Sequence, residues 1–120
     1  MKKSDLYNEL LNTYLHHGWR LRTALLRPET VAELNASAGD LLQSITIKDS
    51  PIDALWFSRP SHQQREAWEL RLLSETQYAL FETFEADETE EQREEMRQEM
   101  EARSHHLAET SPNLPTRHAP

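Results

Sequence analysis

The hydrophobic pattern of the first third of the chain alternates between helical and extended periods. Residues 5–17 carry apolar side chains at helical spacing, follow a potential N-cap at Ser4 and stop before Gly18, which favours a helix. Residues 19–26 alternate apolar and polar side chains with the period of two that is typical of a strand. A short helix is expected over 29–37, because a proline precedes it and two apolar residues share one face.

Two extended segments follow in the middle of the chain. Residues 41–47 place most of their apolar side chains on one side of an extended backbone. Residues 52–59 include an almost continuously apolar stretch, as expected for a strand that is covered on both faces. The residues between them, 48–51, have the composition of a turn.

The segment 61–85 allows two interpretations, a helix or a β-hairpin. Ser61 and Gln64 resemble a capping box, and the residues after them tolerate a helix. However, at about 100° per residue the apolar side chains fall on two separate sides of a helical wheel. With a period of two they alternate cleanly with polar residues, so we predict a hairpin that pairs 67–73 with 78–84.

The last part of the chain predicts an acidic helix and a tail. A second capping-box pattern begins at Asp87, and the helix is expected to end near residue 103. Its apolar stripe is thin, with Met96 and Met100 as its main members, so light docking is expected. Residues 104–120 hold three of the six prolines and little to bury, which predicts disorder.

Together these elements predict one small α+β domain. The expected architecture is a mostly antiparallel sheet of four to five strands, with helices on one face and an acidic C-terminal helix. The predicted organisation is an α+β domain over residues 1–86, the acidic helix over 87–103 and a disordered tail over 104–120.

Charge and length narrow the classes of partner. The chain has 120 residues, the size of one ordinary domain, and a net charge of −8. Residues 85–103 hold nine acids and three arginines, a net charge of −6, so the rest of the chain is near neutral. An acidic protein repels phosphate backbones, which argues against nucleic acid as a partner. No apolar run approaches the roughly 20 residues of a membrane helix, and no signal peptide is evident, so we expect a cytoplasmic protein without a membrane partner.

Several classes of site are excluded by the residues that the chain lacks. It has no cysteine, so it forms no disulfide and no zinc–thiolate centre. Its two glycines, Gly18 and Gly39, are too few for a phosphate-cradling loop, and no serine-hydrolase or zinc-protease motif is present. The neighbouring His16 and His17 would point about 100° apart on a helix, which is poor geometry for one metal ion. No metal and no cofactor is therefore expected.

The most chemically mixed cluster follows the apolar strand at residues 52–59. The candidate ligand-binding residues are Arg59, His62, Arg65 and Glu66. In this hypothesis the two arginines clamp an anion and His62 acts as a general acid or base. The alternative interpretation is a polar turn that caps a short helix.

One short stretch also resembles a known family. Residues 68–71 (WELR) followed by 78–81 (YALF) resemble the hairpin of small ribonuclease toxins of the RelE/HigB type. The resemblance covers about a dozen residues, and it implies a basic sheet face that carries Arg20, Arg22 and Arg71. The chain lacks the basic excess with which those toxins hold RNA.

Three hypotheses for function follow from these observations. The first is a small cytosolic binding or interaction protein without catalysis, which binds a protein partner or forms a homo-oligomer through Met96 and Met100. The alternative is a small-ligand-binding protein or an enzyme with its site near Arg59 and His62. The third is a ribonuclease of the RelE/HigB type, which the acidity disfavours.

Overall fold

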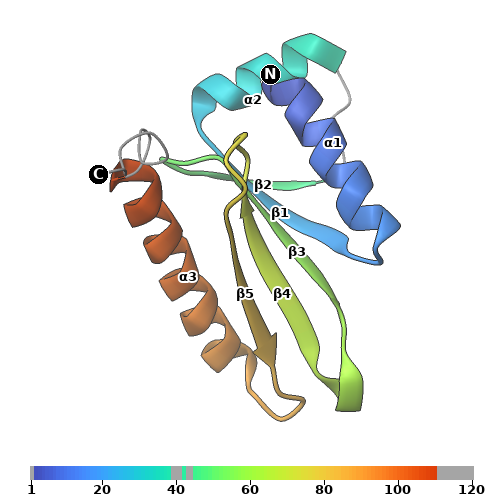
Figure 1. Ribbon diagram of the computed structural model, residues 1–120. Coiled ribbons are helices and arrows are strands. Elements are labelled where there is room, and N and C mark those ends of the chain that lie inside the picture. Colours follow the sequence, from blue (N-terminus) through green and yellow to red (C-terminus); the bar gives the residue numbers. More distant parts are fainter. Residues whose placement is uncertain (1, 39–41, 43–44, 111–120) are drawn as a thin grey trace, which may run out of the picture.

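The structure is a computed structural model that describes residues 2–38, 42 and 45–110 of the chain. It is an α+β fold with a five-stranded sheet and an acidic C-terminal helix, as the sequence predicts (Figure 1). In chain order the elements are α1 (Lys3–His16), β1 (Arg20–Leu26), α2 (Pro28–Ala38), β2 (Thr46–Asp49), β3 (Ala54–Pro60), a 3₁₀ turn η1 (His62–Gln64), β4 (Glu66–Leu72), β5 (Ala79–Phe84) and α3 (Glu90–Thr110).

The sheet is mixed, with the strand order β2-β1-β3-β4-β5. Strands β1 and β2 are parallel, and α2 provides the crossover that a parallel connection needs. The other pairs are antiparallel. Because β1 lies between β2 and β3, the loop 50–53 passes over the end of β1, where the backbone N–H of Ser50 donates to the carbonyl of Leu26 at 3.0 Å.

The predicted hairpin is confirmed. Strands β4 and β5 pair in antiparallel register, with Leu70 opposite Leu80 and Arg71 opposite Ala79. Leu70 is buried on one face, and the alternating Arg71 turns to the other, which is the period-two pattern of the sequence. A helix here would have left one of the two apolar groups without a covering layer.

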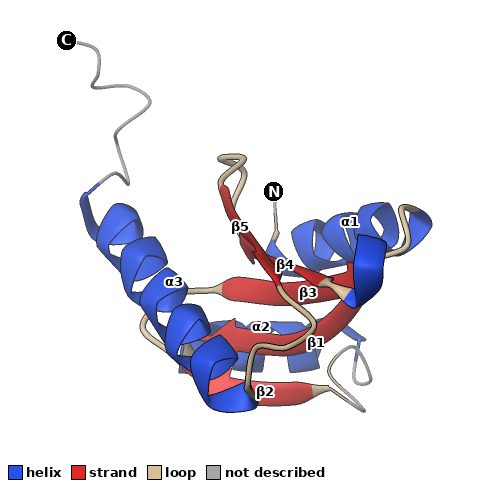
Figure 2. Ribbon diagram, turned by 90° about the horizontal axis from the view of Figure 1, so that it is seen from below, coloured by secondary structure: helices blue, strands red, loops and turns tan. Residues whose placement is uncertain are grey.

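Helices cover both faces of the sheet and create two separate cores. Figure 2 shows α1 and α3 on opposite sides of the strands. The first core lies under α1 and α2, and its largest fully buried side chains are Tyr7, Leu26, Leu34, Leu55, Phe57 and Leu73. The second core lies under α3, and its members are Leu25, Ile52, Ala54, Trp56, Trp68, Leu70, Phe84 and Met100.

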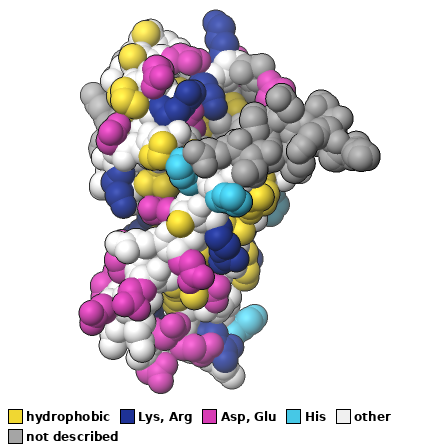
Figure 3. Space-filling model, turned by 90° about the vertical axis from the view of Figure 1, so that its left-hand side faces the viewer, with side chains coloured by type: hydrophobic (Ala, Val, Ile, Leu, Met, Phe, Trp, Pro, Cys, Tyr) yellow, Lys and Arg dark blue, Asp and Glu magenta, His cyan; other side chains and the backbone are white. Residues whose placement is uncertain are grey.

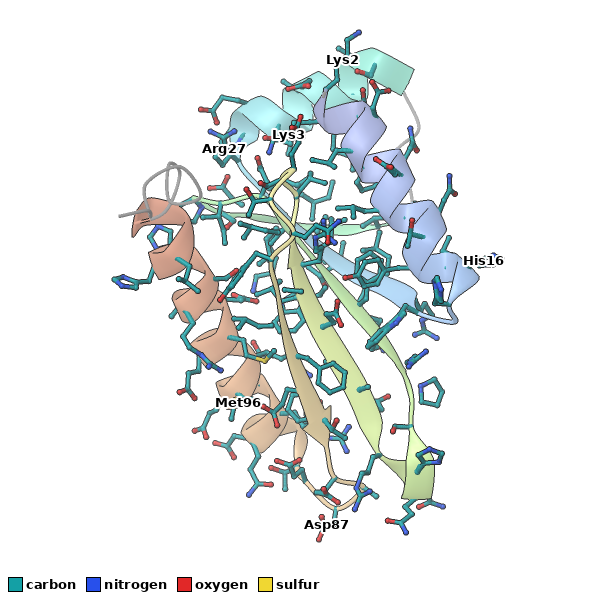
Figure 4. The ribbon with its side chains drawn as sticks, viewed as in Figure 1. Lys2, Lys3, His16, Arg27, Asp87 and Met96 are labelled. Atoms are coloured by element: carbon teal, nitrogen blue, oxygen red, sulfur yellow. The ribbon has the colours of Figure 1, made fainter. Side chains whose placement is uncertain are left out.

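A buried carboxylate joins α1, α2 and the start of β3. Asp53 is only 6% exposed. Its oxygens accept hydrogen bonds from the backbone N–H of Arg27 at 2.8 Å and from the Thr30 hydroxyl at 2.7 Å, and its Oδ2 lies 3.3 Å from Lys3 Nζ. Lys3 and Arg27 lie at the same end of the molecule in Figure 4. A buried charge needs such partners, so Asp53 fixes the β1–α2 junction against β3.

The strand expected over 41–47 lies later in the chain. Residues 39–41 and 43–44 are outside the described residues, and the described strand β2 covers Thr46–Asp49. Lys48 and Asp49, which have the composition of a turn, instead pair with Leu25 and Leu26 of β1. The free energy gained from hydrogen bonds between β1 and β2 therefore outweighs the local preference of these two residues for a turn.

The C-terminal helix is longer and more firmly docked than the sequence indicates. It continues to Thr110, so the disorder predicted from residue 104 is wrong for 104–110, while 111–120 lie outside the described residues. Met100 and Ser104, one turn apart, are fully buried against the sheet, and Met96 packs beside them. A small serine lets the helix approach the sheet closely, which carries the buried stripe past residue 103.

The outer side of α3 remains charged. Acidic side chains gather where α3 begins, in the lower part of the face that Figure 3 presents. Glu91, Glu95 and Glu99, on successive turns of α3, are exposed. Within the described ranges, no helix is both long and apolar enough to span a lipid bilayer.

Candidate functional site

A cavity of about 400 Å³ opens between α3 and the β1–β2 side of the sheet. It lies where α3, which packs mainly on β4 and β5, runs past the same face of β1 and β2. We call it the Arg22 cavity, and it is lined by Arg22, Thr23, Thr46, Lys48, Trp56, Trp68, Glu94, Arg97 and Glu101.

Two tryptophans form the inner wall of the Arg22 cavity. The register places Trp56 opposite Leu70 and Ser58 opposite Trp68, so both indoles reach the α3 face and meet edge to face at 5.8 Å. Each indole N–H has an acceptor: Trp56 donates to Glu101 at 2.8 Å and Trp68 to Glu66 at 3.1 Å. Fully paired and nearly buried, the two rings make a rigid aromatic wall.

Arg22 reaches this wall because of an irregularity in β1. The register between β1 and β3 shifts between Leu21 and Thr23, and such a bulge re-aims the side chain within it. The Arg22 guanidinium carbon lies 4.9 Å from the Trp68 ring centre, and Nη1 donates to the Ser58 hydroxyl at 3.0 Å. No carboxylate of the described residues forms an ion pair with Arg22. A guanidinium has five N–H donors, so most of its capacity is unused.

The second guanidinium on Trp68 is already neutralised. Arg97 of α3 lies 4.6 Å from the Trp68 ring centre and is largely buried. It forms ion pairs with Glu90 and, at 2.9 Å, with Glu94. Arg97 therefore fixes α3 to the aromatic wall, and Arg22 is the cation that remains for a ligand.

The balance of charge in the Arg22 cavity is positive although the protein is acidic. Its lining includes three cations and two carboxylates, a net charge of +1 in a chain of net charge −8. Lys48 and Glu101 face each other at 3.9 Å. The volume falls in the range of small-molecule sites, roughly 300–1,000 Å³. The cavity can therefore receive a small anionic group against an aromatic surface.

The structure does not bring the predicted ligand-binding residues together. The four residues in question are Arg59, His62, Arg65 and Glu66. Arg59 Nη1 donates to the His17 carbonyl at 2.8 Å, and its guanidinium carbon lies 4.7 Å from the Trp19 ring centre, on the α1 side. Arg65 pairs instead with Glu85 at 2.9 Å, beyond the end of β5.

The other two members of that set also have separate surroundings. Glu66 pairs with Arg93 of α3 at 3.1 Å on the opposite face of the sheet from Arg59. His62 is exposed in η1. None of the four residues lines the Arg22 cavity or the two other cavities described below. Their arrangement corresponds to the alternative of a polar turn, and binding by these residues remains a prediction.

The predicted partner-binding methionines face the protein's own sheet. Met100 has no exposed surface, and Met96 is partly buried beside it. Figure 4 shows Met96 on the side of α3 that faces the strands. A partner could reach Met100 only if α3 left the sheet.

The basic face that the ribonuclease resemblance implies does not form. Arg20 pairs with Ser58 and lies, like Arg22, on the α3 face of the sheet. Arg71 pairs with Leu55, whose side chain belongs to the core under α1 and α2, so Arg71 lies on the opposite face. The three arginines therefore share no surface.

His16 and His17 interact with the end of α1 and with each other. His17 Nδ1 lies 2.8 Å from the Thr13 carbonyl, and the two rings meet edge to face at 5.6 Å. Figure 4 shows His16 pointing away from the sheet. Across the described part of the chain, no group of three or more metal-ligating side chains is placed to hold an ion.

Two of the exposed large apolar side chains lie on the edge strand β5 and in the last turn of α1. Phe81 of β5 is 58% exposed and meets the Trp19 ring edge to face at 6.3 Å. Leu15, in the last turn of α1, is 50% exposed. Where exposed and partly exposed apolar side chains adjoin, as Phe81 and Trp19 do, the patch they form can mark a site of protein contact.

A second cavity, of about 390 Å³, lies between α1 and the loop that joins β4 to β5. The described residues of its lining include Glu9, Thr13 and Arg71 and no aromatic side chain. It is a weaker candidate for an anion site than the Arg22 cavity, because its lining carries two acids and one cation.

Sequence reasoning missed Arg22 and Trp68 as partners. The alternation of apolar and polar residues in β1 and β4 is visible in the sequence. What the pattern lacks is any signal for the bulge at Arg22 or for the position at which α3 crosses the sheet.

Comparison of the chain with protein-family models, with curated proteins and with solved structures finds no match. Its function has to be inferred from its own residues.

Proposed function

We propose that the protein is a non-catalytic binding protein and that the Arg22 cavity binds the carboxylate of a small organic anion. The observation that carries the proposal is Arg22 itself. It is a partly buried guanidinium on the cavity wall, held by Trp68 and Ser58, without a carboxylate partner among the described residues.

Electrostatics support an anionic ligand. A guanidinium binds a carboxylate through two parallel hydrogen bonds, which are about twice as strong as neutral ones. The partial burial of Arg22 lowers the local dielectric constant and strengthens the attraction. Lys48, which also lines the Arg22 cavity and lies 3.9 Å from Glu101, adds a second positive charge.

The remaining residues support binding rather than chemistry. Glu101 accepts the indole N–H of Trp56, and Glu94 accepts from Arg97, so both carboxylates in the Arg22 cavity already have donors. Thr23 and Thr46 provide hydroxyl groups on the floor. In this assignment Arg22 binds the anion, Trp56 and Trp68 contact its apolar part, and Arg97 holds the wall in place.

Benzoate and benzamide provide the test, because they share a shape and differ in charge. In ¹⁵N-detected NMR titrations we expect benzoate to shift the indole resonances of Trp56 and Trp68 and the amides of Thr23 and Thr46. Benzamide should cause no comparable shift. Arg22→Gln, which removes the charge and keeps a polar side chain, should weaken benzoate binding at least about tenfold, since a charge-assisted pair is lost.

Arg20 supplies the matched control. It lies two residues before Arg22 on the same face and is exposed, but it does not line the Arg22 cavity. Arg20→Gln removes the same charge from the protein and should leave binding nearly unchanged. Equal losses of benzoate affinity in the two variants would show that only the net charge of the protein matters, which contradicts a specific role of Arg22. Absence of benzoate-induced shifts in the unmodified protein would overturn the proposal.

Self-association is a second candidate, carried by the exposure of Phe81 and Leu15. We propose a second copy of this chain as the partner, in keeping with the expectation of a homo-oligomer. Sedimentation velocity of the full chain should then reveal a dimer that Phe81→Ser reduces to a monomer. A chain that is monomeric at high micromolar concentration contradicts this candidate.

A further inference from the structure

A further cavity of about 380 Å³ adjoins the Arg22 cavity, between α3 and the loop that joins β2 to β3. Two residues, Lys48 and Glu101, line both cavities. Their charged groups are 3.9 Å apart, so a partly exposed ion pair stands where the cavities meet. Such a pair is worth little, about 0–1 kcal/mol, and can rearrange around a ligand. The two cavities are therefore neighbours along α3, divided by this ion pair, and we refer to the two together as the groove.

The length of the groove follows from the helix that forms its wall. Its lining residues on α3 extend from Glu94 to His105. At 1.5 Å per residue, this stretch of helix is about 16 Å long. An extended peptide advances about 3.3 Å per residue, so about five residues would occupy the groove.

The two ends of the groove carry opposite charge. The Arg22 cavity has a net charge of +1. In the adjoining cavity the charged lining residues are Lys48, Asp49 and Glu101, a net charge of −1 with His105 neutral. A ligand that fills the groove is therefore favoured if it is negative at one end and positive at the other.

The lining of the adjoining cavity fits a peptide. Leu25 and Ile52 give the floor an apolar part, and Ala102 leaves space on the helix side. Ser50 and Gln98 offer both donors and acceptors. The backbone amides of a bound peptide need such hydrogen-bond partners. A hydrocarbon chain would leave the polar groups of Ser50 and Gln98 without a partner from the ligand.

We propose that the groove binds an extended peptide segment of about five residues, with an acidic residue in the Arg22 cavity and a basic residue beside Glu101 and Asp49. The proposal rests on the proposed function, since it takes the carboxylate at Arg22 as the anchor. It adds the class of ligand and the direction in which the ligand leaves the cavity.

Two blocked pentapeptides of equal composition test the charge spacing. One has glutamate and lysine at its two ends with three alanines between them, and its isomer has glutamate and lysine adjacent. We expect the first to bind at least about fivefold more tightly in NMR titrations. It should shift the amides of Leu25 and Ile52 in addition to those that benzoate shifts.

A variant that fills only the adjoining cavity tests peptide binding separately from anion binding at Arg22. Ala102 is exposed and lines only the adjoining cavity, so Ala102→Phe should obstruct the peptide and leave benzoate binding intact. Arg103→Phe, at the next and equally exposed position, lines neither cavity and serves as the matched control. Circular dichroism of both variants checks that α3 still forms.

Each outcome decides one of the two proposals. Tighter binding of the spaced peptide, lost in Ala102→Phe and kept in Arg103→Phe, supports the groove. Equal binding of the two isomers, or an unchanged affinity in Ala102→Phe, overturns the groove while benzoate binding sustains the proposed function. Failure of benzoate to bind removes the anchor and with it both proposals.

Discussion

At the scale of single residues, two buried tyrosines link the α1 face to pH. Tyr14 stacks on Phe57 at 4.1 Å, and its hydroxyl donates to the Glu69 carboxylate. Burial, together with that neighbouring negative charge, raises the pKa of Tyr14 to about 12. Burial alone raises the pKa of Tyr7 to about 12. Both groups are thus held in the neutral form by the folded state.

Alkaline pH should therefore destabilise the protein between about 10 and 12. In the unfolded chain a tyrosine ionises near pH 10, but in the folded protein these two ionise only near 12. The stability is fully present below pH 10 and is lost as the pH rises through 12, by about 2–3 kcal/mol for each residue. Urea unfolding at a series of pH values measures the loss. Tyr14→Phe should roughly halve it, and an identical slope in the variant would contradict the assignment.

At the scale of elements, α3 shows how a charged helix can dock on a sheet. Its apolar stripe is narrow, so arginines take over part of the contact. Arg93 and Arg97 lie over the rings of Phe84 and Trp68, and each pairs with a glutamate. The aliphatic stem of arginine covers apolar surface while its charge remains paired, which suits a helix rich in glutamate.

The interface between α3 and the rest of the protein includes a buried polar group without a hydrogen-bond partner, which leads to a prediction. Ser104 is completely buried, and its hydroxyl has no hydrogen-bond partner among the described residues. Ser104→Ala should raise the free energy of unfolding by about 1–2 kcal/mol, since it removes an unpaired buried group and improves helix propensity. Chemical denaturation measures the change. Ser37→Ala, the same substitution at an exposed position of α2, should yield no gain of that size, and a destabilised Ser104→Ala would contradict the account.

At the scale of the whole molecule, α3 belongs to the folded body. The aromatic core under α3 includes Trp56, Trp68 and Phe84, and α3 supplies Met100 to it. The organisation predicted from the sequence separates residues 1–86 from the helix. With α3 removed, the face that now carries these three aromatic residues would be open to water.

Removal of residues 87–120 should therefore cost cooperative folding. Burial of apolar surface is worth about 25 cal/mol per Å², and each of the three aromatic residues buries on the order of 150–250 Å². We expect the truncated protein to bind a hydrophobic dye, to associate and to lose a sharp thermal transition. Removal of 111–120 alone isolates the contribution of α3. A cooperative, monomeric fragment 1–86 would show that the sequence-based division was right.

Side-chain alternation and capping patterns in the sequence predicted much of the fold. Alternation along β4 and β5 defined the hairpin, since a side-chain period of two exposes one face and buries the other. The capping pattern at Asp87 placed the start of α3 within a few residues. The candidate site was beyond reach of the same reasoning. Arg59, His62, Arg65 and Glu66 are close in the chain, but alternation along the strands sends Arg59 and Glu66 to opposite faces.

The sequence by itself determined most of the elements, though not the position of β2 or the end of α3, because caps, turns and periodicity act over a few residues. Only the tertiary structure decided that β1 lies between β2 and β3, that α3 covers part of one face, and that a bulge turns Arg22 toward Trp68. These features depend on pairing between distant segments. Their free energy belongs to the packed layers as a whole, so no single stretch of the chain carries a signal for them.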